Sequence, residues 1–196
     1  MYKSVSENIL NNPELGRLVI LNGPPGTGKT HLIKNLTQDF AHKARVLFMS
    51  PDLVSQVGGP DFNKFLIEQS NHGLPIVIVV EDADFLISKR NKESVAALSA
   101  LLNLGDGICG EAFDTRIICT SNEEEVHIDD AILRPGRLFC RIEVGNLEPD
   151  KANNLIKKEL GDDSDVKYEE NVLLGTIFTK INTIKRNRAL TENSSI

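Results

Sequence analysis

Runs of apolar residues alternate with stretches of helical periodicity through most of the chain. Valine, isoleucine and leucine dominate these runs, and near-continuous apolarity is typical of strands that are buried on both faces of a sheet. Strands that alternate with helices predict βαβ units, and hence an α/β fold with a parallel five-stranded sheet flanked by helices. The expected strands are residues 17–22, 44–50, 75–80, 115–121 and 139–144.

The pattern changes after Val144. Residues 148–160 and 172–188 have helical periodicity, and a polar connection separates them. The sequence therefore predicts two parts, an α/β domain over residues 1–147 and a short helical module with a frayed tail over residues 148–196.

The composition is that of an ordinary globular protein, with 40% hydrophobic and 26% charged residues, so neither a fibrous nor a disordered chain is expected. No apolar stretch approaches the roughly 18 residues of a membrane span, and the polar start lacks the blocks of a signal peptide, so we expect a cytoplasmic protein. The net charge of −6 gives no electrostatic footprint for a nucleic-acid backbone. The three cysteines have no CxxC spacing, which argues against a structural zinc site.

The segment GPPGTGKT at residues 23–30 directly follows the first expected strand and opens a helix. In a loop of this spacing, glycines let backbone N–H groups wrap around phosphates, the lysine reaches the outer phosphates and the hydroxyl holds Mg²⁺. A chance Gly/Pro turn is the alternative, and the order of strand, loop and helix argues against it. The predicted nucleotide-binding residues are Gly23, Pro24, Pro25, Gly26, Thr27, Gly28, Lys29, Thr30 and His31.

The third expected strand ends in two adjacent carboxylates, in the segment IVIVVED. A nucleotide site of this type needs one carboxylate that holds Mg²⁺ through its waters and another that orients or deprotonates the attacking water. By position, Glu81 is the expected magnesium partner and Asp82 the water-activating residue, with Asp84 as a bystander or helix cap. A solvent-facing acidic strand end is the alternative, and the phosphate loop argues against it.

The fourth expected strand runs into Asn122, and DDAILRPGRLFCRIEV lies downstream. Together with the phosphate loop and the acidic pair, these motifs resemble the AAA family of ring-forming ATPases over roughly residues 16–150. The resemblance implies a Mg²⁺-dependent ATPase in which Asn122 is a sensor that positions the attacking water. It further implies that Arg134 and Arg137 are arginine fingers for a neighbouring subunit of a hexamer-like homo-oligomeric ring that acts on a protein client.

The order of the acidic pair, Glu81 before Asp82, is similar to that of one AAA branch, the mitochondrial inner-membrane translocases that export the folded Rieske protein. The transmembrane and targeting segments of that branch have no counterpart in this sequence. The likeness implies that the Glu-Asp order still supports hydrolysis.

Three features depart from the family pattern. The segment before the phosphate loop is short, which leaves base selectivity open. Residues 55–61, SQVGGPD, lack the aromatic residue that grips an unfolded chain, which favours loading or remodelling over threading. A second-sensor arginine is not evident, with Arg186 and Arg188 as the candidates.

Two other functions stay open. One is an ATP-loaded switch or loader with little turnover. The other is a small P-loop kinase, which would leave Asn122 and the LRPGR turn without a role.

Overall fold

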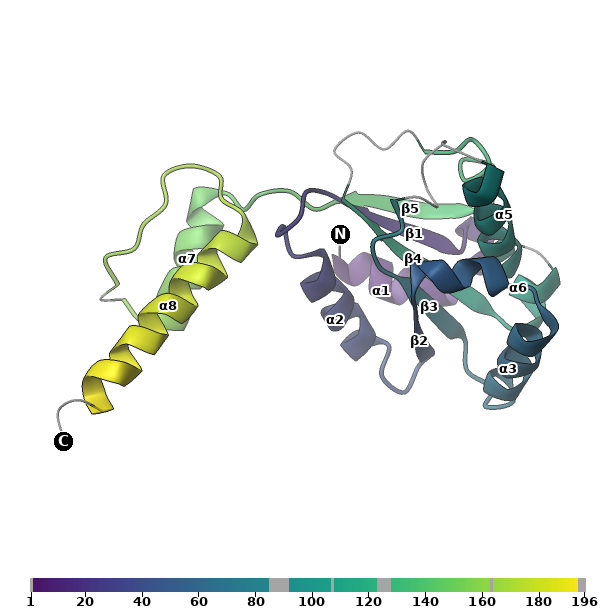
Figure 1. Ribbon diagram of the computed structural model, residues 1–196, viewed down its shortest axis with the longest axis horizontal. Helices are drawn as coiled ribbons and strands as arrows, with labels where there is room; N and C mark the ends of the chain where they lie inside the picture. Colours follow the sequence, from purple (N-terminus) through teal and green to yellow (C-terminus); the bar gives the residue numbers. More distant parts are fainter. Residues whose placement is uncertain (1, 85–91, 107, 123–127, 163, 194–196) are drawn as a thin grey trace. The chain divides into compact units, whose positions relative to one another are not determined.

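A parallel five-stranded sheet, flanked by helices, is the centre of the larger part of the molecule (Figure 1). The computed structural model describes residues 2–84, 92–106, 108–122, 128–162 and 164–193. The strand order is β2-β3-β4-β1-β5, and all neighbouring strands are parallel, which confirms the predicted α/β fold. The elements are α1 (Tyr2–Asn11), the 3-10 helix η1 (Pro13–Leu15), β1 (Leu18–Asn22), α2 (Lys29–Asp39), β2 (Arg45–Met49), the 3-10 helix η2 (Pro51–Gln56), α3 (Pro60–Ser70), β3 (Ile76–Val80), α5 (Lys92–Asp106), α6 (Ile108–Ala112), β4 (Thr115–Ser121), β5 (Leu138–Glu143), α7 (Pro149–Leu160) and α8 (Leu174–Asn193).

The strand order and the parallel direction bring the predicted motifs to one end of the sheet, the end formed by the carboxyl ends of the strands. Because all strands run the same way, their carboxyl ends meet at that end, where ligands bind in open α/β sheets. β4 lies between β1 and β3, and the register pairs Asn22 with Ser121 and Val80 with Cys119. The residues directly after β1, β3 and β4, which are Gly23, Glu81 and Asn122, therefore lie at the same end of the sheet, and the Gly23 N–H donates to the Ser121 carbonyl.

Burial differs between the central and the edge strands. β1, β3 and β4 are buried throughout, because each has a strand on both sides and packs against helices. β2 and β5 lie at the edges and are only partly buried, and Phe48 on β2 is 66% exposed. The expectation that all five strands are buried was therefore wrong for these two, since an apolar run does not reveal which strand ends a sheet.

A buried arginine ties α1 to the sheet. The side chain of Arg116 on β4 is 1% exposed, and its guanidinium donates to the carbonyls of Ile9 (2.7 Å) and Leu10 (3.3 Å) at the end of α1. It also forms an ion pair of 2.7 Å with Asp114. Burial lowers the pKa of Arg116, and the hydrogen bond to Asp114 opposes this shift.

The chain divides into two compact units, residues 1–23 with 29–143 and residues 24–28 with 144–196. In the second unit, the Gly175 N–H donates to the Gly26 carbonyl at 2.8 Å, and α7 packs against α8. Within the described part of the chain, we find no helix with the length and apolarity needed to cross a bilayer. The buried cluster of the second unit consists of Ala152, Ile156, Leu160, Ile177 and Ile181.

Candidate active site

The phosphate loop connects β1 to the first turn of α2. Gly26 and Gly28 have φ angles of 82° and 103°, a left-handed backbone that glycine adopts without steric cost. Lys29 begins α2, and its buried side chain donates from Nζ to the Gly23 carbonyl at 2.5 Å. Thr30 and His31 follow in the same helical turn, and both are exposed. The loop thus has the left-handed glycines, the lysine and the position at a helix N-terminus that phosphate binding uses.

The acidic residues after β3 lie within electrostatic reach of Lys29. Burial lowers the pKa of Lys29, and the negative charges of Asp82 and Asp84 oppose that shift. The end of β3 and the start of α2 are therefore neighbours, as the strand order requires. The positive charge of Lys29 would therefore interact both with a bound nucleotide phosphate and with the carboxylates of Asp82 and Asp84.

The backbone turns sharply directly after Glu81. Asp82 has φ +54°, a left-handed conformation that aspartate tolerates better than most residues. Its N–H donates to Thr120 Oγ1 at 2.8 Å, and the next N–H, of Ala83, donates to the Thr120 carbonyl at the same distance. Thr120 on β4 therefore holds the turn that carries Asp82.

The predicted sensor and the predicted water-activating residue are in direct contact. Asn122 donates from Nδ2 to Asp82 Oδ1 at 2.7 Å. Asp82 is exposed and Glu81 is partly buried, so the carboxylate that contacts Asn122 is open to a ligand at the strand edge. Lys29, Asp82 and Asn122, which lie far apart in the sequence, come together in the structure.

Asp84 does more than the bystander or helix cap that the sequence predicts. Its Oδ1 accepts hydrogen bonds from Ser121 Oγ at 2.6 Å and from the Asn122 N–H at 2.7 Å. Sequence reasoning missed this contact and the contact of Thr120. The available signal was the pair of hydroxyl residues, Thr120 and Ser121, directly before the sensor.

The two predicted arginine fingers lie in a turn before β5. Arg134 is exposed, and the Arg137 N–H donates to the Arg134 carbonyl at 3.2 Å. The Arg137 guanidinium donates to the Ala131 carbonyl at 2.8 Å, within the same segment. The acidic residues at 123–125 lie outside the described residues.

The residues at the strand edge fit Mg²⁺ with a nucleotide. In proteins, Mg²⁺ with phosphates typically takes only one or two side-chain oxygens and keeps several waters. Thr30 is exposed in the first turn of α2 and Glu81 is partly buried directly after β3, so a hydroxyl and a carboxylate are available as candidate ligands. Among the described residues, no three His, Cys, Asp or Glu side chains gather as a dedicated metal cage, which this type of site does not need.

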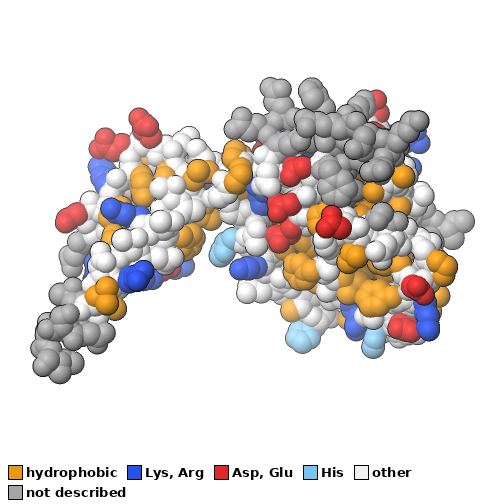
Figure 2. Space-filling model, viewed as in Figure 1, with side chains coloured by type: hydrophobic (Ala, Val, Ile, Leu, Met, Phe, Trp, Pro, Cys, Tyr) orange, Lys and Arg blue, Asp and Glu red, His pale blue; other side chains and the backbone are white. Residues whose placement is uncertain are grey.

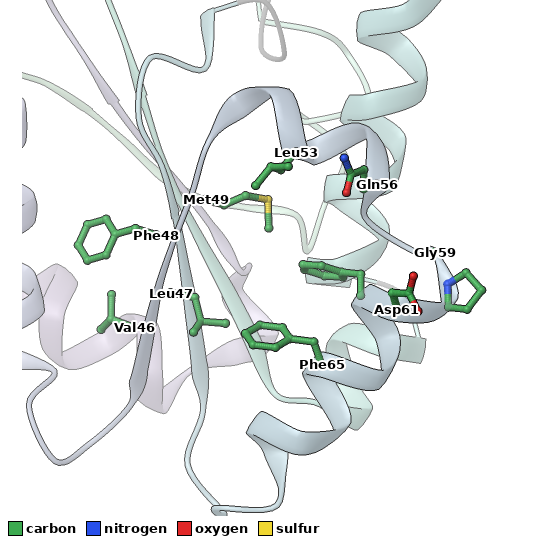
Figure 3. Close-up of a pocket in the computed structure, with 11 residues that line it drawn as sticks. Val46, Leu47, Phe48, Met49, Leu53, Gln56, Gly59, Asp61 and Phe65 are labelled. Atoms are coloured by element: carbon green, nitrogen blue, oxygen red, sulfur yellow. The ribbon is translucent and has the colours of Figure 1, made fainter.

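A separate apolar groove of about 670 Å³ opens beside β2 (Figure 3). Leu47 and Met49 point into it toward α3, where Phe65 faces them, whereas Phe48 points to the other side of the strand. Hydrophobic side chains gather on the exposed face over β2 and α3 (Figure 2). None of the predicted nucleotide-binding residues lines this groove.

Comparison with known proteins identifies the family. Residues 19–146 match the family described as "ATPase family associated with various cellular activities (AAA)". The proteasome-activating nucleotidase 2 of Halobacterium salinarum is 31% identical over 153 residues, which cover 74% of this chain and 36% of that protein. The proteasome-associated ATPase of Mycobacterium tuberculosis is 28% identical over 167 residues, which cover 72% of this chain and 27% of that protein.

The matched part of the chain thus spans between about a quarter and about a third of the length of these relatives. The family match covers the sheet from β1 to β5 and includes the phosphate loop, the acidic pair and the sensor position. This chain belongs to the AAA family of ATPases.

Proposed function

We propose that this chain hydrolyses ATP with Mg²⁺ at the subunit interfaces of a hexamer-like ring, and uses the turnover to load or remodel a protein client. The main support is the contact between Asn122 Nδ2 and Asp82 Oδ1 beside Lys29. This contact joins a sensor amide to a carboxylate at the edge of the sheet where the phosphate loop begins.

In this proposal, the loop N–H groups and Lys29 bind the phosphates of ATP. Thr30 and Glu81 would hold Mg²⁺, which would neutralise part of the phosphate charge. Asp82 accepts a proton from a water molecule that Asn122 orients. The water oxygen then bonds to the terminal phosphorus, the bond from that phosphorus to the bridging oxygen breaks, and ADP and phosphate leave.

The order of Glu81 and Asp82 is compatible with this chemistry. Glu81 would hold Mg²⁺ indirectly, through a water, so a different rotamer or a shifted water would accommodate its additional methylene. The shorter Asp82 starts from a left-handed turn and is held by Asn122, which fixes the position of its carboxylate. The Rieske-protein translocase branch has the same Glu-Asp order, which motivates this part of the proposal. The resemblance to that branch rests on this order alone.

Arg134 and Arg137 are proposed to complete the site of a neighbouring subunit. An arginine finger contributes about 10³ to 10⁵ in rate in this class of reaction, so a monomer should be nearly inactive. The names of the two relatives link them to the proteasome, which supports a protein as the client of this chain.

The loop before α3 favours loading or remodelling over threading. Val57 is 6% exposed and packs in the core, while its neighbours Gln56 and Gly58 are exposed but carry no apolar side chain. The segment at 55–61 therefore offers little to grip an unfolded chain.

The test is the ATPase rate per chain as a function of protein concentration, with the mass of the assembly measured in parallel. We expect the rate per chain to rise as the ring forms, with Lys29→Ala as the control that does not bind ATP. A flat and negligible rate in an assembled ring supports the switch. Phosphoryl transfer to an added acceptor supports the kinase.

A further inference from the structure

We propose that Asp84 is a positioning residue that places the sensor Asn122, and through it Asp82, for water activation. This inference rests on the proposed function of Asp82 and Asn122. It starts from the two hydrogen bonds that Asp84 Oδ1 accepts, from Ser121 Oγ at 2.6 Å and from the Asn122 N–H at 2.7 Å. Both donors belong to consecutive residues at the end of β4.

The position of the sensor follows from these contacts. The Asn122 side chain has only two torsions between its backbone and the amide that donates to Asp82. A fixed backbone at Asn122 therefore restricts the amide to a small volume. Hydrogen bonds to a carboxylate are roughly twice as strong as those between neutral groups, so Asp84 is a better anchor than a neutral acceptor.

Two hydrogen bonds, both accepted by Thr120, hold the segment that carries Asp82. Thr120 accepts the N–H of Asp82 through its hydroxyl and the N–H of Ala83 through its carbonyl. Asp82 and Ala83 are thus held by Thr120 on β4, and the Asn122 backbone is held by Asp84. Loss of Asp84 removes the acceptor of the Asn122 N–H, while Asp82 and Ala83 keep their hydrogen bonds to Thr120.

The alternative is that Asp84 acts directly on phosphate binding. The negative charge of Asp84 raises the pKa of Lys29, against the effect of burial. Removal of Asp84 would then change the affinity for ATP through Lys29. The two roles differ in what they alter. A positioning role lowers kcat, whereas a role through Lys29 alters the Kd for ATP.

The experiment compares Asp84→Ala with Asp84→Asn in the full chain under assembly conditions. We expect Asp84→Ala to lower kcat by about 10- to 100-fold, because displacement of a catalytic group by about 1 Å has an effect of that size. The Kd for ATP should stay within about twofold of the parent value. The kcat of Asp84→Asn should lie between those of the parent and Asp84→Ala, because its amide oxygen can accept the same two hydrogen bonds but carries no charge.

Combination with Asn122→Ala tests whether Asp84 acts through the sensor. If it does, the double variant Asp84→Ala, Asn122→Ala should be no slower than Asn122→Ala alone. Fully additive losses, or a kcat of Asp84→Ala equal to that of the parent, would overturn the inference. Ser121→Ala removes one of the two hydrogen bonds and should lower kcat by less than Asp84→Ala does. This variant tests the inference if Asp84→Ala does not fold.

A second readout separates this inference from the proposed function. Hydrogen exchange at the Asn122 backbone amide should be faster in Asp84→Ala, because that N–H loses its acceptor. If the assembled parent does not hydrolyse ATP, the proposed function fails, and this exchange rate decides the positioning role. Unchanged exchange at Asn122 would then overturn it.

Discussion

At the scale of single residues, the turn at Asp82 is the most informative feature. A left-handed backbone costs a non-glycine residue about 1 kcal/mol or more, and such conformations gather at functional sites. Thr120 and Asn122 hold this turn by hydrogen bonds to the backbone and to the carboxylate. These hydrogen bonds offset the cost of the left-handed conformation, and one of them joins the two members of the candidate catalytic pair, Asp82 and Asn122.

Cys119 allows a prediction at the same scale. Burial raises the pKa of this β4 thiol from 9.0 to about 12, so the thiolate is rare in the folded chain. At pH 9.0 we expect Cys119 to resist iodoacetamide in buffer and to react in urea, with mass spectrometry of its peptide as the measurement. The raised pKa contributes stability that is fully present below pH 9 and is lost as the pH rises toward 12. Rapid alkylation in buffer would contradict the burial of this strand.

At the scale of elements, α1 depends on a polar anchor as well as on apolar packing. Val5 and Ile9 are buried, and the carbonyls at the end of the helix accept from Arg116. A charged side chain on a central strand is costly to bury unless its hydrogen bonds are made. Arg116 meets this condition through Asp114 and the two α1 carbonyls.

Arg116→Met should destabilise the chain by about 3 kcal/mol, because two carbonyls at the end of α1 lose their charged donor. Urea unfolding measures the decrease in the free energy of unfolding. Hydrogen exchange should show the largest increase in exchange rate at the amides of α1. Lys185→Met removes a surface ion pair with Glu159 and is the control, for which we expect little change. An Arg116→Met chain as stable as the parent would mean that α1 is held by its apolar contacts alone.

At the scale of the whole molecule, the proposed ring divides each active site between two chains. The phosphate loop, the acidic pair and the sensor belong to one subunit, and Arg134 and Arg137 are proposed to reach the next. Arg134 is the cleaner residue for a test, because it is exposed, whereas Arg137 also contacts the carbonyl of Ala131.

Arg134→Ala should bind ATP like the parent and lose turnover by about 10³-fold or more. Mixed with Asp82→Asn chains, it should regain activity at interfaces where its intact site meets an intact arginine from the neighbour. Each variant alone, at the same total concentration, is the control. Mixed assemblies with no recovery would count against action between subunits.

The sequence was sufficient for the parallel five-stranded sheet, because apolar runs mark strands. It marked Asp82 and Asn122 as candidates, but the hydrogen bond between them was not predicted. It was not sufficient for contacts that depend on the strand order. The burial of Arg116 and the exposure of Phe48 follow from which strands are central and which lie at an edge. The hydrogen bonds of Asp84 to Ser121 and Asn122 were missed because they need β3 and β4 to be neighbours in a known register.

The most direct test of the central claim, that this chain hydrolyses ATP with Asp82 as the water-activating residue, is the single-turnover rate of Asp82→Asn at saturating ATP. The substituted amide oxygen can still accept the hydrogen bond from Asn122, so the geometry is retained while the base is lost. We predict ATP binding equal to that of the parent and hydrolysis slower by about 100-fold or more. An assembled Asp82→Asn chain that hydrolyses ATP as fast as the parent would contradict this account.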